Sequence, residues 1–315
     1  MLVENKKIIN ATVIILTYNE ELHIRRLLEN LVGVFESIVI VDSGSTDNTV
    51  KIAEKFGVIV KHNKWPGDHA SQLNWAIDNI NINTDWVIRI DADEVLPEDV
   101  IVELGIKLNN ATPLIGGFEM KIGNIFLGRK IRYGGTFPLK IVRVWRTGKA
   151  CCDGLLMDEK MIIDDDLSID KIDSVFWNHN LNGFSVWIEK HNHYSTKEAI
   201  EQILRNRKNL HLQGREVSSN PNIQLIKRSY EKSPRSIRAL LYFLYRYIFR
   251  GGFLDGLPGF LWHFFQGFWY RLLVDSKVIE FENLSGGDDA KMAKIISRYS
   301  DFVVKAGTKV NRGAN

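Results

Sequence analysis

Apolar and polar positions alternate along the first hundred residues in blocks that predict strands and helices in turn. Four apolar, partly β-branched runs are short enough for buried strands: 11–16, 37–41, 58–61 and 86–90. The intervening segments carry apolar residues near helical spacing, which predicts helices at 20–32, 48–57 and 70–80. Because strands that alternate with helices form βαβ units, we expect an α/β fold with a mostly parallel sheet.

Polar residues directly follow three of the predicted strands. These clusters are Thr17–Glu20, Asp42–Ser45 and Asp91–Glu94. In an open parallel sheet, ligands bind outside the carboxyl ends of the strands. All three clusters are therefore expected to face one crevice, and the chemistry of the protein is expected there.

The second half of the chain has a less regular pattern. Glycine-punctuated short strands (GGFEM, GNIFLG and LKIVRVW) are expected over 113–145, and a long surface helix over 184–216. Aromatic-rich helices are predicted over 236–274, and the polar tail after about 284 is expected to be loosely ordered. These features divide the chain into an α/β domain at 1–220, a helical region at 221–283 and a tail at 284–315.

Composition supports a folded globular protein and argues against some classes. The 315 residues are 45% hydrophobic and 25% charged, which is enough for a sizeable core, and a net charge of +3 argues against a dedicated nucleic-acid binder. Cys151 and Cys152 are neighbours, which suits neither a disulfide nor a structural zinc site, so a reducing, cytosolic compartment is expected. We find neither a signal peptide nor an apolar run of about 18 residues that would predict a membrane-spanning helix.

Asp91 and Asp93 are the first candidates for chemistry, because they directly follow an apolar strand. Two carboxylates one residue apart can both reach a hard divalent cation, and Mg²⁺ or Mn²⁺ commonly binds one or two carboxylates together with substrate phosphates. Asp42 follows another buried strand and can accept hydrogen bonds from a base or ribose. Taken alone, either segment is also compatible with a solvated acidic turn.

The acidic residues of the second half include candidates for a catalytic base. Asp158 and Glu159 are the candidates to take a proton from an attacking hydroxyl, although an exposed acidic pair is the simpler local interpretation. His179 is a candidate metal ligand, with a structural hydrogen-bonding role as the alternative. His191 and His193 are discounted as a metal pair, because positions i and i+2 of a helix do not share a face.

Together these motifs resemble glycosyltransferase family 2. The resemblance is carried by the order and spacing of Val13–Glu20, Val41–Thr49 and Asp91–Glu94. It implies a GT-A fold, meaning a Rossmann-like, mostly parallel sheet flanked by helices, with a nucleotide-diphosphate sugar donor, Mn²⁺ or Mg²⁺, and inversion at the anomeric carbon. The α/β domain then has a nucleotide-sugar half at about 10–100 and an acceptor half at about 101–220.

The same resemblance implies roles for individual residues. Asp93 would hold the metal together with Asp91, and Asp91 would also lie near the ribose and diphosphate. His179 is a third candidate metal ligand. Glu159 matches the presumed base of the family, with Asp158 as the second candidate. The residues expected to bind the donor are Thr17, Tyr18, Asn19, Glu20, Asp42, Ser43, Gln72, Asn74, Asp91 and Ala92.

More narrowly, the chain is similar to the bacterial lipopolysaccharide-core and exopolysaccharide branch of that family. The similarity is seen at Trp65–Gly67, at Gln72 and Asn74, and in the segments EKHN, YS and GFLDG. It implies a lipid-linked or saccharide acceptor in the synthesis of cell-surface polysaccharide, with UDP as the favoured nucleotide.

Aromatic and basic residues concentrate over 235–274, as in helices that lie in the headgroup layer of a membrane. We therefore predict a membrane-associating appendage, and a cytoplasmic protein attached peripherally to the inner face of the cytoplasmic membrane. An aromatic helical core or a homo-oligomer interface is the alternative. Two other functions are the alternatives: a sugar-nucleotide pyrophosphorylase, which would be expected to carry a glycine- and arginine-rich loop after the first strand, and an inactive membrane-associated scaffold.

Overall fold

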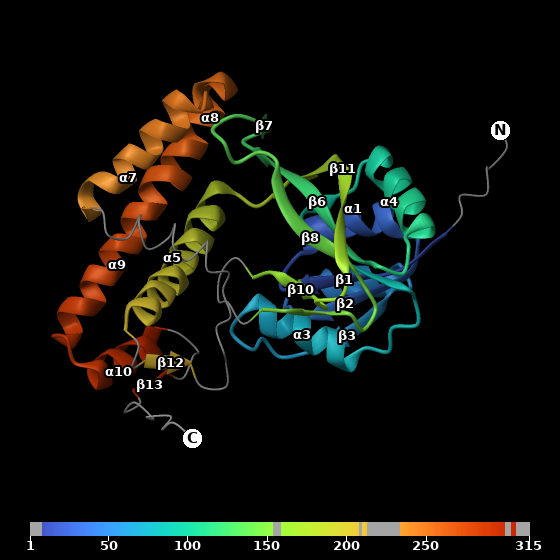
Figure 1. Ribbon diagram of the computed structural model, residues 1–315, viewed down its shortest axis with the longest axis horizontal. Coiled ribbons are helices and arrows are strands. Elements are labelled where there is room, and N and C mark those ends of the chain that lie inside the picture. Colours follow the sequence, from blue (N-terminus) through green and yellow to red (C-terminus); the bar gives the residue numbers. More distant parts are fainter. Residues whose placement is uncertain (1–7, 154–158, 208–209, 213–233, 300–303, 307–315) are drawn as a thin grey trace.

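A computed structural model describes residues 8–153, 159–207, 210–212, 234–299 and 304–306. It shows a sheet with flanking helices and, beside it, a group of long helices (Figure 1). Helix α5 belongs to this second group, although it precedes the predicted boundary at 220. The two parts are called the sheet part and the helical part below.

The sheet part is built on one mixed sheet, in the strand order β3-β2-β1-β4-β8-β6-β11-β5, with β7 paired to β6. Strands β1, β2, β3 and β4 are parallel, as the sequence predicts, whereas β8 runs antiparallel to both of its neighbours. Strands β6 and β11 are also parallel, so the parallel pairing that the sequence predicts is interrupted by β8 and the sheet as a whole is mixed. The strands are β1 (Ile9–Thr17), β2 (Phe35–Asp42), β3 (Ile59–His62), β4 (Trp86–Arg89), β5 (Glu94–Val95), β6 (Ile115–Phe126), β7 (Arg129–Ile131), β8 (Leu139–Arg146) and β11 (Ser168–Asn178).

Both faces of this sheet are covered, which explains the continuous apolar runs. Along β1, Val13 and Ile15 point into one core, while Ile14 points into the other. The first core includes residues of α1 and α4, and the second includes residues of α3, β9 and β10. The bounds are α1 (Glu21–Leu31), α2 (Thr49–Lys55), α3 (His69–Asn79), α4 (Glu98–Asn110), β9 (Ala150–Cys152) and β10 (Met161–Ile163).

The predicted short strands around the glycines of 115–126 are in fact one twelve-residue strand, β6. Its glycines mark close approaches rather than breaks. A Cβ at Gly116 would overlap with Ile163 and Leu167, and a Cβ at Gly123 would overlap with Trp177. The prediction that these glycines separate short strands is therefore wrong.

The helical part consists of α5 (Phe184–Asn206), α7 (Arg235–Leu244), η1 (Tyr245–Phe249), η2 (Gly252–Asp255), α8 (Gly256–His263), η3 (Phe264–Trp269), α9 (Tyr270–Ser285) and α10 (Asp289–Tyr299). Helices α5, α9 and α10 share a core of their own that includes Ile200, Val278 and Ile296. The tail is thus helical over 289–299, and the expectation of a loosely ordered segment is wrong there. The apolar residues of α10 are few but fall on one face. A short antiparallel pair, β12 (Leu210–Leu212) with β13 (Val304–Ala306), lies next to α10.

The two parts are joined through the segment between β7 and β8. The Asp255 carboxylate accepts the backbone N–H groups of Arg132 and Tyr133, both at 2.9 Å. The buried His263 ring lies so close to Gly134 that a Cβ at this position would overlap with it. The φ of Gly134 is +82°, which also favours glycine. This contact fixes the helical part against the sheet and so sets the width of the space between them.

Candidate active site

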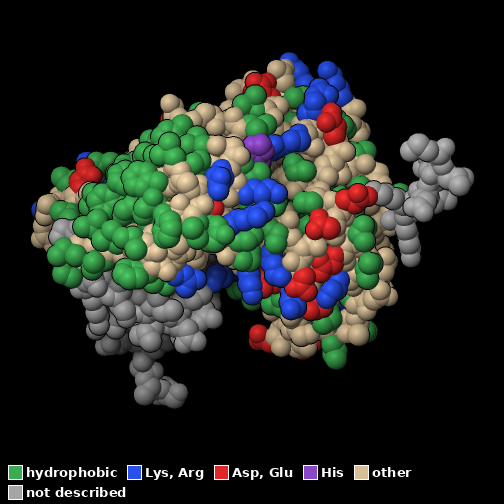
Figure 2. Space-filling model, turned by 90° about the horizontal axis from the view of Figure 1, so that it is seen from above, with side chains coloured by type: hydrophobic (Ala, Val, Ile, Leu, Met, Phe, Trp, Pro, Cys, Tyr) green, Lys and Arg blue, Asp and Glu red, His purple; other side chains and the backbone are tan. Residues whose placement is uncertain are grey.

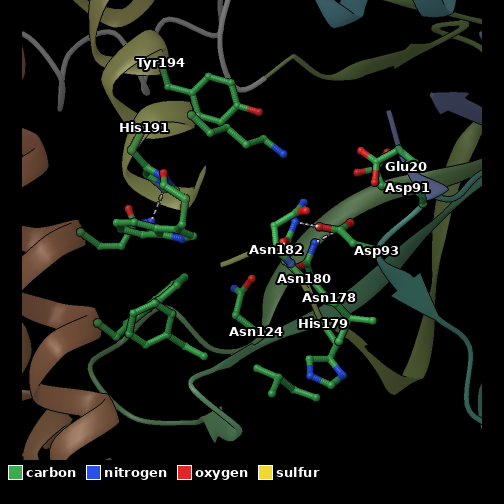
Figure 3. A pocket seen from close by; sticks show the side chains of 18 of the residues that line it. Glu20, Asp91, Asp93, Asn124, Asn178, His179, Asn180, Asn182, His191 and Tyr194 are labelled. Carbon is green, nitrogen blue, oxygen red and sulfur yellow. Dashed lines mark hydrogen bonds between the residues drawn. The ribbon is translucent and has the colours of Figure 1, made fainter. Parts of the chain in front are cut away.

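A cavity of about 650 Å³ lies between the carboxyl ends of β1 and β4 and the helical part. Figure 3 shows Glu20, Asp91 and Asp93 on one side of it, with His191 and Tyr194 of α5 opposite. The polar cluster after β4 and the end of the cluster after β1 therefore meet in one cavity. The cluster after β2 lies at the same edge of the sheet, but its residues do not line the cavity.

Asp42 is saturated by its own turn. Its carboxylate accepts the hydroxyls of Thr17 and Ser45 and the backbone N–H groups of Gly44 and Ser45, at 2.5 to 3.0 Å. Burial alone would raise the pKa of Asp42, but these hydrogen bonds lower it, so the group is charged at neutral pH. In this structure Asp42 shapes the turn after β2, and its contact with a base stays a prediction.

The residues after β1 are shared between the same turn and the cavity. The Asn19 side-chain oxygen accepts the Thr46 N–H at 2.8 Å, which holds Asn19 at a φ of 57°. Tyr18 is exposed. Glu20 lines the cavity, and its carboxylate is held by the His23 ring at 2.7 Å.

Three of the predicted donor-binding residues lie behind the cavity wall and do not line the cavity: Ser43, Gln72 and Asn74. The Gln72 amide donates to the Ser43 hydroxyl at 3.0 Å, which ties α3 to the turn after β2. Asn74 uses both side-chain polar atoms on the backbone of Cys152, at 2.7 and 3.0 Å. Direct contact of Asn74 with the donor stays a prediction, and its visible role is to position β9.

Asp91 is enclosed by two arginines. Arg89 donates to it at 3.1 Å and Arg143 at 2.8 Å, and Arg143 also bridges to the buried Glu94 at 3.0 Å. Burial would raise the pKa of Asp91, but Arg143 and Arg89 hold it far below its usual value. Burial, together with the charges of Asp91 and Asp93, raises the pKa of Glu94 to about 8, although Arg143 acts to lower it. The charge of Asp91 is therefore already compensated within the protein.

Asp93 differs from Asp91 because its partners are neutral. Its two carboxylate oxygens accept the side-chain amides of Asn178 at 3.0 Å and Asn180 at 2.9 Å (Figure 3). Asn178 is the last residue of β11, and Asn180 lies in the segment that follows. Strand β11 pairs with β5, which begins directly after Asp93. Neither asparagine was predicted from the sequence, although both are direct neighbours of His179, which was.

His179 lines the cavity, but its ring is engaged by Arg26. The Arg26 guanidinium can only donate, so Nδ1 of His179 accepts at 3.2 Å and the proton of the neutral ring lies on Nε2. Burial lowers the pKa of His179, with Arg26 adding to the effect, so the ring is neutral. In this tautomer neither nitrogen is free for a metal.

These geometries can be tested against the divalent ion that the resemblance implies. Among the described residues, no group of three or more His, Cys, Asp or Glu side chains is placed to hold a metal. Asp93 still suits Mg²⁺ or Mn²⁺, because its carboxylate carries no cationic partner and such ions take most of their ligands from phosphates and water. The residues present therefore fit a metal held by Asp93 and by the substrate together, with Asp91 kept apart by its arginines.

Glu159 lines the cavity close to Asp91. Its carboxylate is joined to Arg89 at 2.9 Å, so one guanidinium bridges the predicted base and the first aspartate of the Asp91–Ala92–Asp93 segment. Ala92 lines the cavity between the two aspartates. Asp158, the second candidate base, lies outside the described residues.

Helix α5 contributes lining residues that were not among the predicted site residues. Trp187, Lys190, His191 and Tyr194 all line the cavity, and their spacing places them on one face of the helix. His191 stacks on Trp187 with ring centroids 3.6 Å apart, and burial lowers its pKa to about 4. His193 of the same helix does not line the cavity.

Comparison with known proteins agrees with this arrangement. Residues 12–154 match the sequence model of glycosyl transferase family 2. Over 90 residues the chain is 38% identical to an uncharacterized glycosyltransferase of Rickettsia conorii, a segment that covers 29% of this chain and 31% of that protein. The glycosyltransferase SunS of Bacillus subtilis is 32% identical over 87 residues, covering 27% of this chain and 20% of SunS. The chain thus spans about a third or less of the length of the curated relatives it matches.

Among solved structures, glucosyl-3-phosphoglycerate synthase of Mycobacterium tuberculosis, in complex with Mn²⁺, UDP and glucosyl-3-phosphoglycerate, is 21% identical, with a TM-score of 0.31. That likeness covers 36% of this chain and 43% of the synthase.

The parallel strands, with acidic residues of the cavity at the carboxyl end of β4, define an α/β protein with a cleft at the carboxyl edge of its sheet. Across residues 12–154 the chain is similar to glycosyltransferase family 2. The family match and the sheet confirm the predicted GT-A fold with a C-terminal, aromatic-rich helical region.

Proposed function

We propose that this protein transfers a sugar from a nucleoside-diphosphate donor to an acceptor hydroxyl, in a single displacement that inverts the anomeric carbon. The observation that carries the proposal is the position of Asp93 and Glu159 in one cavity at the carboxyl ends of the parallel strands. The match to glycosyltransferase family 2 adds to it.

In this proposal the donor lies along the ends of β1 and β4. Asp93 holds the divalent ion, Mn²⁺ or Mg²⁺, which when bound neutralises charge on the diphosphate leaving group. Asn178 and Asn180 fix the Asp93 carboxylate, and Arg89 and Arg143 fix Asp91 beside the donor. A UDP-sugar is the favoured donor.

Glu159 takes the proton from the attacking hydroxyl. Its hydrogen bond with Arg89 uses one carboxylate oxygen and holds the other in a defined place. The acceptor hydroxyl would therefore lie beside the Glu159 carboxylate within the same cavity.

The test is a calorimetric titration of the whole protein with UDP, GDP, ADP and dTDP, each with and without Mn²⁺. We expect one nucleotide to bind, and to bind more tightly with Mn²⁺. If a folded protein bound none of the four under either condition, an inactive scaffold would replace the transferase as the best interpretation.

We further propose that the acceptor is lipid-linked or a membrane-associated saccharide, as in bacterial cell-surface polysaccharide synthesis, and that the helical part rests on an anionic bilayer. None of the helices within the described ranges is long and apolar enough to cross a membrane. Figure 2 shows hydrophobic side chains gathered over the helical part, with Lys and Arg side chains between this patch and the sheet part. The exposed apolar residues are Ile237, Leu240, Leu241, Ile248, Phe249, Phe253, Leu254, Leu257 and Phe260.

The basic residues at this surface differ from those that the sequence suggested. Arg238 is buried in an ion pair with Asp275, and Arg246 is buried as well, so these two cannot meet headgroups. Arg250 of the predicted segment is exposed, and further exposed cations come from β7, where Arg129 donates a hydrogen bond to the Leu254 carbonyl. An apolar surface beside exposed cations is suited to an anionic interface.

Sedimentation with anionic liposomes at low salt tests this membrane contact. Phe249 and Leu257 are 78% and 69% exposed, and we expect replacement of both by serine to weaken binding about tenfold or more, because two large apolar side chains no longer enter the interface. The matched control is Leu114→Ser, which removes a side chain that is 68% exposed on the sheet part. Equal binding by the wild type and the double variant would rule this surface out.

A further inference from the structure

We propose that Lys190 on α5 forms a second subsite for the donor diphosphate, opposite Asp93 and separate from the metal. The inference rests on the proposed function but goes beyond it, since it gives the helical part a direct role in holding the nucleotide. The chemistry recognised is a diphosphate, contacted by an ammonium group from across the cavity.

The position of Lys190 follows from the helix. It lies three residues after Trp187 and four before Tyr194, and all three line the cavity from the same face of α5. Figure 3 shows that Tyr194, on this face, points across the cavity toward the side that carries Asp91 and Asp93. The Lys190 ammonium lies 5.8 Å from the centre of the Tyr194 ring.

The other long cationic side chains that line the cavity are engaged. Arg89 bridges Asp91 and Glu159, and Arg143 bridges Asp91 and Glu94. Lys197 donates to the Gly67 carbonyl at 2.8 Å. Lys190 interacts with the Tyr194 side chain, but no ion pair joins it to a carboxylate within the ranges that the structure describes.

The surroundings of Lys190 favour its charged form. Burial acts to lower the pKa of the ammonium group, but Tyr194, Asp93 and Glu20 outweigh it and raise the pKa above its usual value. Lys190 therefore brings a full positive charge toward Asp93 and Glu20 without pairing with either.

A diphosphate is the ligand that this charge distribution suits. A divalent ion held by Asp93 loses part of its charge to that carboxylate, so a donor diphosphate would remain only partly neutralised. An ammonium from the opposite wall completes the neutralisation, as lysine does in other phosphate sites, where it acts as a compact point charge. A neutral acceptor sugar would gain little from a charged lysine, so we assign Lys190 to the donor.

The experiment is a calorimetric titration of the wild type and Lys190→Met with the nucleoside diphosphate that binds and with its monophosphate, in Mn²⁺ and in EDTA. We expect Lys190→Met to weaken the diphosphate about tenfold or more, and the monophosphate much less, because a hydrogen bond between charged groups is lost. The loss should persist in EDTA, since the subsite does not depend on the metal. Lys190→Arg, which keeps the charge, should restore part of the affinity.

Lys149→Met is the matched control, because it removes the same charge from an exposed lysine that does not line the cavity. Circular dichroism checks that each variant is folded. Unchanged diphosphate affinity in Lys190→Met, or an equal loss for monophosphate and diphosphate, would overturn the subsite while leaving the transferase proposal intact. If the wild type bound no nucleotide at all, both proposals would fail.

Discussion

Asp93→Ala is expected to lower sugar transfer by about a thousandfold or more, and to remove the effect of Mn²⁺ on nucleotide binding. The reason is that Asp93 alone among the cavity aspartates has neutral partners, so its charge is free for a cation, whereas Asp91 is neutralised by two arginines. Loss of this ligand removes several kcal/mol of stabilisation from the departing diphosphate. The measurement is nucleotide release in the presence of an acceptor, together with calorimetry in Mn²⁺ and in EDTA.

Two further variants make this result specific. Asp166→Ala removes an exposed carboxylate from the turn between β10 and β11 and should leave both readouts unchanged. Asn180→Ala should have a smaller effect than Asp93→Ala, since it removes one hydrogen bond from the carboxylate and leaves the charge in place. An Asp93→Ala protein that still responds to Mn²⁺ would show that the metal is held elsewhere.

The first half of the fold could be predicted because its signals are local. Strands β1, β2 and β4 are short apolar runs buried on both faces, and each ends at a polar cluster, so the position of the site followed from the topology. The roles of individual side chains did not follow in the same way. The Asp42 carboxylate, for example, accepts hydrogen bonds from the turn after β2, and the Asn74 side chain bonds to the backbone of β9.

The other half of the cavity depends on contacts that no local pattern contains. Arg143 reaches Asp91 only because β8 inserts antiparallel beside β4, and the Asn178 amide reaches Asp93 because β11 pairs with β5. Lys190 looks like a solvated helix residue in the sequence, and it meets the cavity only because α5 belongs to the helical part. The long-range pairings, rather than the residue types, decide these functions.

Glu159→Gln is the second variant with a large expected effect. Transfer should fall by roughly a hundredfold to ten-thousandfold, because the amide cannot take the proton of the acceptor hydroxyl. Nucleotide binding should change little, since the base acts on the acceptor, and the amide oxygen can still accept the Arg89 hydrogen bond that positions Asp91. Transfer rates with saturating donor, set beside calorimetric affinities, separate the two effects.

Glu159→Ala provides the matched comparison, because it removes the base and the Arg89 contact together. Its transfer should be as low as that of Glu159→Gln, while its nucleotide affinity should fall further, since Arg89 loses one of its two carboxylate partners and no longer holds Asp91 as firmly. If Glu159→Gln kept full activity, the base would have to be another group, and Asp158 is the next candidate to replace. If both variants lost nucleotide binding to the same extent as transfer, Glu159 would belong to the donor site and not to the acceptor.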